Sequence, residues 1–170
     1  GGFIVTNSKK LFDKLRMIRN HGMLHGYDTR IFGLNLRLPE ISAAIAKIQI
    51  KKLPSFLIKR RKNARILSEL ISDLDIKIPK ERKNEKVNWY LYTIETNNRE
   101  QVLKKLNSKG IGAAAYYPIP VHKTPFYNKK IKLPSTDWAA SHVLSLPIHP
   151  LVSPKNIEFI AKTVRESLTR

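Results

Sequence analysis

Apolar and polar positions recur with helical spacing over several long stretches of the chain and with strand-like spacing over a few short ones. After Ser8, apolar residues return every three or four positions, which predicts a helix capped by Ser8 or Asn7 and ended near Gly22. The β-branched and aromatic run at 2–6 predicts a short strand ahead of that helix.

Beyond Pro39 the helical spacing continues to about residue 74, which predicts a long helix with Pro39 in its first turn. Pro54 lies inside this pattern. A proline within a helix removes a backbone hydrogen bond and clashes with the preceding turn, so we expect a kink or a short break there. A long helix of this kind often links two domains.

From residue 75 onward the elements predicted are strand, strand, helix, strand, helix, strand and helix. The strands are expected at 76–79, 87–96 and 111–118 and within the run VLSLPIHP, and the helices at 98–110, at 136–143 and after Ser153. This order favours a small α+β domain with its helices on one face of a mostly antiparallel sheet. The pattern therefore divides the chain into a tail of another domain at 1–35, a linking helix at 36–74 and a small domain at 75–170.

The composition fits a folded protein, because 42% of the 170 residues are hydrophobic and 8% are aromatic. There is no cysteine, which excludes disulfides and thiolate metal sites. No apolar run is long enough to span a bilayer, and nothing resembles a signal peptide, so the expected compartment is the cytoplasm.

The charge is strongly positive, with 32 Lys and Arg against 13 acids, a net charge of +19. Such a balance favours polyanions, namely nucleic acid, anionic membranes or phosphorylated substrates, unless the lysines form a solvated surface. The cluster at 59–62, KRRK, lies within a helical pattern and fits a solvated face. No helix-turn-helix, zinc finger or basic zipper is visible, so nucleic acid is not the expected partner.

Most catalytic and metal-binding signatures are missing. The sequence contains no P-loop, no GxGxxG, no HExxH and no GxSxG, and its histidines do not have metal-ligand spacing. On motifs alone, the chain is not a self-contained enzyme, and we expect no metal site.

Three constellations of polar residues remain. Asn35 and Arg37 alternate with leucines directly ahead of the long helix, where an amide and a guanidinium can both donate to a phosphate, or can simply cap the helix or form a surface salt bridge. In "YYPIPVHKTPFY", Tyr117 and His122 lie on a proline-stiffened loop that suits a sugar or nucleotide, unless the tyrosines pack in the core. His149, between a proline and an apolar run, is more often structural than a ligand.

Taken together, these stretches resemble the DegT/DnrJ/StrS family of sugar aminotransferases that depend on pyridoxal 5'-phosphate (PLP). The similarity runs in order over nearly the whole chain. It is carried by "GGFIVTNSKKLFDKLRMIRNHG", "GLNLRLPEISAAIAKIQIKKLPSFLIKRRKNA", "YYPIPVHKTPFY" and "STDWAASHVLSLPIHPLVSPKNIEFIAKTV". It implies the aspartate aminotransferase-like fold, in which residues 1–35 end the large PLP-binding domain.

The resemblance also implies roles for the polar residues. The family residue that matches Asn35 reaches across a dimer interface and donates to the cofactor phosphate of the partner subunit, and Arg37 lies near the same interface. Tyr117 and His122 become candidates for contact with the sugar. The implied partners are a second copy of the chain, an amino-acid donor such as glutamate and a keto sugar attached to a nucleotide.

The resemblance further implies that this chain is a C-terminal portion. The family needs a Schiff-base lysine, an Asp that protonates the pyridine nitrogen and an aromatic residue stacked on the ring. No lysine of this chain has the expected context, so we expect no catalytic residue here and no activity or cofactor retention by the chain alone. Two alternatives stay open: a DegT-like pleiotropic regulator that binds DNA, and a non-catalytic subunit that dimerises with a complete enzyme.

Overall fold

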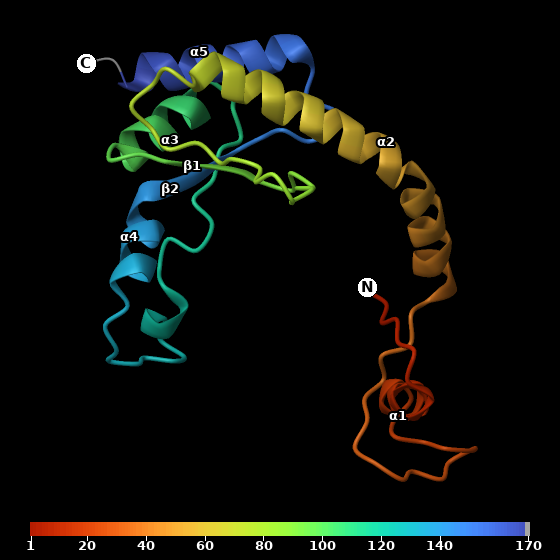
Figure 1. The fold of residues 1–170 in the computed structure, drawn as a ribbon. Helices are drawn as coiled ribbons and strands as arrows, with labels where there is room; N and C mark the ends of the chain where they lie inside the picture. Colours follow the sequence, from red (N-terminus) through yellow and green to blue (C-terminus); the bar gives the residue numbers. More distant parts are fainter. Residues whose placement is uncertain (169–170) are drawn as a thin grey trace. The chain divides into compact units, whose positions relative to one another are not determined.

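The computed structural model describes residues 1–168, and the chain forms two compact units, Gly1–Lys52 and the part from Leu53 onward (Figure 1). The boundary between the units lies inside helix α2 (Glu40–Ile71), just before Pro54. The second half of α2 belongs to the second unit, because Ala64, Leu67 and Ile71 are buried in that unit's core.

The first unit begins with an extended segment and helix α1 (Lys9–Arg19). The side chain of Ser8 accepts a hydrogen bond from the amide of Leu11 at 3.3 Å, so the predicted cap is confirmed. The predicted strand at 2–6 is wrong for the described chain. A strand needs a neighbour for its backbone groups, and no other segment among residues 1–168 pairs with it.

Helix α2 runs without interruption from Glu40 to Ile71 and contains Pro54. The expected break into two helical segments is therefore wrong, and the kink stays a prediction. The proline ring leaves the carbonyl four residues earlier without its usual donor, which a helix tolerates when the rest of its ladder is intact.

The second unit is built on strands β1 (Tyr92–Glu95) and β2 (Val143–Leu146), which pair antiparallel with Tyr92 opposite Leu146. Isolated bridges extend the pair on both sides, Lys77 with Glu95 and Ala114 with Ser145. All four predicted strands therefore lie in one antiparallel arrangement, but two of them contribute only a single bridge.

The strands are shorter than predicted because the backbone turns away at two aromatic residues. Trp89 has a φ of +51° and Tyr117 a φ of +58°, values that a strand cannot accommodate. Trp89 is held in this conformation by its stacking on Tyr92, with 5.8 Å between ring centroids, and by a hydrogen bond from Arg60 to its carbonyl at 3.0 Å. Residues 87–96 are rich in β-branched and aromatic residues, a composition typical of a strand, so the sequence does not reveal this turn.

Three helices and one short 3₁₀ helix complete the second unit. They are α3 (Arg99–Ser108), η1 (Val121–Lys123), α4 (Pro134–His142) and α5 (Pro154–Leu168). Helices α3 and α5 lie on the same side of the two strands in Figure 1, as expected for an α+β domain. The hydroxyl of Ser153 accepts from the amide of Asn156 at 3.2 Å and caps α5, as the sequence predicted.

The core of this unit joins the buried faces of the second half of α2, both strands, α3 and α5. Its fully buried apolar side chains are Leu67, Ile71, Tyr92, Ile94, Val102, Leu106, Leu144, Ile157 and Val164. Each such side chain contributes about 1.5–3 kcal/mol through burial. Among the residues described, no helix is long and apolar enough to cross a membrane.

Candidate functional site

Asn35 is fixed to the end of α1 by backbone hydrogen bonds on both of its sides. The amide of Leu34 donates to the carbonyl of Ile18 at 2.8 Å, and the amide of Leu36 donates to that of Arg19 at 2.9 Å. These bonds also provide partners for carbonyls at the C-terminal end of α1, which a helix leaves unpaired. Asn35 therefore lies on a segment that backbone hydrogen bonds hold against the end of α1.

The chain can return to α1 because two glycines meet backbone to backbone. Gly22 has a φ of +74°, and a Cβ on it would lie 1.7 Å from the carbonyl oxygen of Ile31. A Cβ on Gly33 would lie 2.0 Å from the nitrogen of Gly22. No side chain fits at either position without moving the segment that carries Asn35.

The structure brings Asn35 and Arg37 together, as the sequence suggested. Arg37 Nε donates to Asn35 Oδ1 at 2.9 Å, and both side chains are exposed. Because the amide oxygen accepts from the guanidinium, the amide nitrogen Nδ2 is left to donate outward. Within residues 1–168 no group accepts a hydrogen bond from Nδ2, so the pair offers amide and guanidinium donors to an anion.

Tyr117 and His122 lie on one loop of the second unit, but their exposure differs. The Tyr117 side chain is 76% exposed, so the suggestion that it packs in the core is wrong. His122, in η1, is only 9% exposed. The structure therefore leaves the phenol free to meet a ligand and keeps most of the imidazole inside.

His122 faces the first turn of α4. Its Nε2 lies 3.9 Å from Asp137 Oδ1, and Lys123 Nζ lies 2.7 Å from the same oxygen. Nε2 has no hydrogen-bond partner among the described residues. The His122 carbonyl accepts from the amide of Lys129 at 2.8 Å, so this residue holds the loop together through its backbone as well.

His149 has a structural position. Its Nδ1 accepts from the amide of Leu151 at 3.3 Å, within a turn that Asn63 of α2 binds. The Asn63 side-chain amide donates to the carbonyl of His149 at 3.3 Å and to that of Val152 at 3.1 Å. This agrees with the expectation that His149 is structural.

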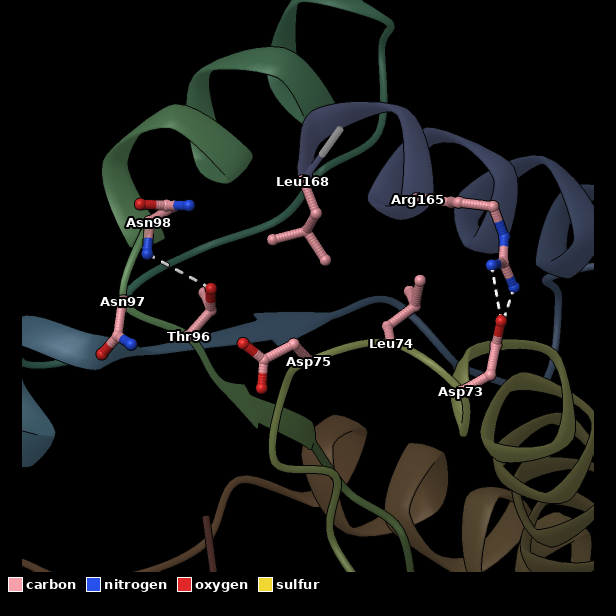
Figure 2. A pocket seen from close by; sticks show the side chains of 8 residues that line it. All are labelled: Asp73, Leu74, Asp75, Thr96, Asn97, Asn98, Arg165 and Leu168. Carbon is pink, nitrogen blue, oxygen red and sulfur yellow. Dashed lines mark hydrogen bonds and ion pairs between the residues drawn. The ribbon is translucent and has the colours of Figure 1, made fainter. Parts of the chain in front are cut away.

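A pocket of about 490 Å³ that the sequence did not predict lies where α2 ends, α3 begins and α5 ends (Figure 2). It is lined by Asp73, Leu74, Asp75, Thr96, Asn97, Asn98, Arg165 and Leu168. Arg165 closes one side with hydrogen bonds of 2.7 and 2.8 Å to Asp73, and this guanidinium holds the pKa of the Asp73 carboxyl below its usual value. The lining comes from separate segments, so no local motif could have revealed it.

A second group of polar residues surrounds Glu95 at the edge of β1. Glu95 Oε1 accepts from Lys77 Nζ at 2.7 Å and from Trp138 Nε1 at 3.1 Å, and these bonds lower the pKa of its carboxyl. The Trp138 ring stacks on His142 with 3.5 Å between centroids. The polar side chains around Glu95 thus bind one another. No group of three or more metal-ligating side chains occurs in the part of the chain that is described.

Comparison with known proteins defines the class. The chain matches the DegT/DnrJ/EryC1/StrS aminotransferase family over residues 1–165. The crystal structure of DesV from S. venezuelae superimposes with a TM-score of 0.92 at 32% identity, covering 98% of this chain and 46% of that one.

Two curated relatives are similarly close. A pleiotropic regulatory protein of Geobacillus stearothermophilus is 33% identical over 98% of this chain and 46% of its own length. A UDP-N-acetyl-3-dehydro-alpha-D-glucosamine 3-aminotransferase of Acidithiobacillus ferrooxidans is 33% identical over 99% of this chain and 46% of its own.

The chain belongs to the DegT/DnrJ/EryC1/StrS aminotransferase family. It spans slightly less than half the length of the relatives it matches. Membership of this family implies PLP as the cofactor of the complete protein.

Proposed function

We propose that this chain is the C-terminal part of a PLP-dependent aminotransferase that transfers an amino group to a nucleotide-linked keto sugar. The observation that supports this most is the Asn35–Arg37 pair, held on the end of α1 within a family match that covers residues 1–165. The amino donor is an amino acid such as glutamate, and the active assembly is a homodimer.

The phosphate of the cofactor would be held in part by Asn35, acting on the partner subunit's site. The free Nδ2 of its amide can donate to a phosphate oxygen, and Arg37 adds a positive charge next to it. Both groups are exposed in the chain, as an interface contact requires before assembly. When bound, PLP supplies the electron sink that stabilises the substrate carbanion.

Tyr117 is our candidate for contact with the sugar. Its exposed phenol combines a flat apolar face with a hydroxyl that donates and accepts hydrogen bonds, which suits a pyranose ring. His122 would act mainly behind it, because the buried imidazole and the backbone bond to Lys129 keep the loop in place.

A regulatory role is the second candidate. It is favoured by the name of the Geobacillus relative and by the net charge of +19. Sequence-specific binding to duplex DNA that persists at physiological salt would support it, since non-specific binding by a basic protein weakens steeply as salt rises. A non-catalytic subunit that pairs with a complete enzyme would instead raise the activity of that enzyme without turnover of its own.

The experiment is to express the protein from the complete reading frame and incubate it with PLP, glutamate and a panel of UDP- and dTDP-linked keto sugars. We expect an amino sugar and 2-oxoglutarate in equal amounts. No turnover with any member of the panel, in a folded protein that has bound PLP, would contradict the proposal.

A further inference from the structure

The stretch from 101 to 136 is the longest part of the second unit without an acidic residue, and lysines are spread along it. These are Lys104, Lys105, Lys109, Lys123, Lys129, Lys130 and Lys132. Three of them, Lys129, Lys130 and Lys132, follow one another on the loop that carries Tyr117 and His122. We refer to these three as the lysine triad.

The lysine triad is exposed and is not neutralised by the rest of the unit. All three residues are exposed, and within residues 1–168 no carboxylate forms an ion pair with any of them. The first acidic residue after the triad is Asp137, and it already forms an ion pair with Lys123, with 2.7 Å between Oδ1 and Nζ. Three positive charges within four residues repel one another, so a bound anion would relieve a cost that the free protein carries.

The backbone that leads into the triad is ordered. The amide of Asn128 donates to the carbonyl of Thr124 at 2.9 Å, and the amide of Lys129 donates to that of the buried His122 at 2.8 Å. The triad therefore begins at a residue whose backbone is bonded to the buried His122, and its three side chains are exposed. A charge run in a free tail would have no such anchor.

We propose that the lysine triad, Lys129, Lys130 and Lys132, binds the diphosphate of the nucleotide-sugar substrate. This inference rests on the proposed function. In such a substrate the diphosphate is bonded directly to the sugar, so a loop that meets the sugar with Tyr117 can bring the lysines further along the same loop to the phosphates. Lysine ammonium groups are flexible point charges that suit the exposed, freely rotating oxygens of a diphosphate.

The test uses the complete enzyme loaded with PLP and a triad variant, Lys129→Ala/Lys130→Ala/Lys132→Ala. The matched control, Lys104→Ala/Lys109→Ala/Lys155→Ala, removes the same charge from exposed lysines of the same unit. Binding of UDP, dTDP and GDP is measured by calorimetry at 50 and 300 mM salt, and the corresponding monophosphate and nucleoside of the tightest binder are measured in parallel.

We expect the triad variant to bind the preferred diphosphate at least about tenfold more weakly, since each exposed charge contact contributes modestly. The triad variant should lose less affinity for the monophosphate than for the diphosphate, and none for the nucleoside. The affinity of the control variant for the diphosphate should change by less than about twofold. Salt should weaken binding to the intact enzyme more than binding to the triad variant, because screening acts on the charges that the variant lacks.

Equal affinity of the triad variant and the intact enzyme for the diphosphate would overturn the inference and leave the proposed function standing. An equal loss in the control would also overturn it, because the effect would then come from net charge. If the intact enzyme binds none of the three diphosphates and turns over no keto sugar, the proposed function fails, and the inference falls with it.

Discussion

Arg37 Nε donates a 2.9 Å hydrogen bond to Oδ1 of Asn35, two residues earlier on a segment that is fixed to the end of α1. This bond gives the amide a defined orientation, with its NH₂ group directed away from the guanidinium. An amide that only capped the following helix would present its oxygen to the helix amides instead. The geometry therefore favours a donor role for Asn35, and the predictions below follow from it.

In the complete enzyme, Asn35→Leu should weaken cofactor retention by roughly 10- to 100-fold. Leucine has a similar volume but cannot donate, and a hydrogen bond to a charged phosphate contributes about 1.5–3 kcal/mol. Arg37→Ala should weaken retention by roughly tenfold, through loss of the charge and of the orientation of the amide. Dialysis followed by the PLP absorbance measures retention, and Asn84→Leu, at an exposed site of the second unit, serves as the control.

Gly33→Ala should weaken cofactor retention at least as much as Asn35→Leu, without unfolding the second unit. The new Cβ would meet the nitrogen of Gly22 at 2.0 Å, so the segment that carries Asn35 has to move. Gly112→Ala is the matched control, because a Cβ there meets nothing within 4 Å and its φ is not positive. Retention by Gly33→Ala equal to that of the control would show that the position of this segment does not matter for the cofactor.

The ion pair between Asp73 and Arg165 should make stability depend on pH. The hydrogen bonds from Arg165 lower the pKa of Asp73 in the folded state, so the pair contributes fully above the ordinary aspartate pKa of about 3.9. The contribution is lost as the pH falls through the lower pKa of the folded state. Asp73→Asn should therefore lower the melting temperature at pH 7 and have little effect near pH 2.

Asp75→Asn is the control for that measurement, because Asp75 lies in the same pocket and forms no ion pair within residues 1–168. Its melting temperature should follow that of the unchanged chain over the whole range. If Asp73→Asn and Asp75→Asn give the same curve, the ion pair seen in Figure 2 does not stabilise the protein in solution.

The 170-residue chain alone should not catalyse transamination. None of its lysines has the sequence context of the Schiff-base lysine, and without that amine covalent catalysis cannot begin. Incubation with PLP, glutamate and nucleotide-linked keto sugars, with detection of the amino sugar, provides the measurement. Turnover that a single lysine substitution removes would show that the chain carries its own catalytic amine.

The sequence predicted the helices better than the strands, for a physical reason. Helix α5 shows its spacing and its Ser153 cap within fifteen residues, so local information was enough. The length of the strand near Trp89 was overestimated, because the left-handed conformation of Trp89 depends on Arg60, which lies far away in the sequence. Residues 2–6 have strand-like composition but no neighbour among the described residues, and composition cannot supply one.

The candidate site could also be predicted only in part from the sequence. Asn35 and Arg37 could be paired from their spacing, whereas the meeting of Gly22 with Gly33 that positions them could not. Tyr117 and His122 were treated alike because they share a motif. Their different exposure arises because His122 lies in η1, where it is buried and faces Asp137 of α4, and these two residues meet only in the folded unit.

A mixed dimer of the complete enzyme tests most directly the central claim, that Asn35 holds the cofactor of the partner subunit. One subunit lacks the Schiff-base lysine and keeps Asn35, and the other keeps the lysine and carries Asn35→Leu. The only site with a lysine then faces an intact Asn35, so we predict normal cofactor retention and about half of the activity of the unchanged dimer. Loss of cofactor from that site, as severe as in the Asn35→Leu homodimer, would contradict the account and place Asn35 in the site of its own chain.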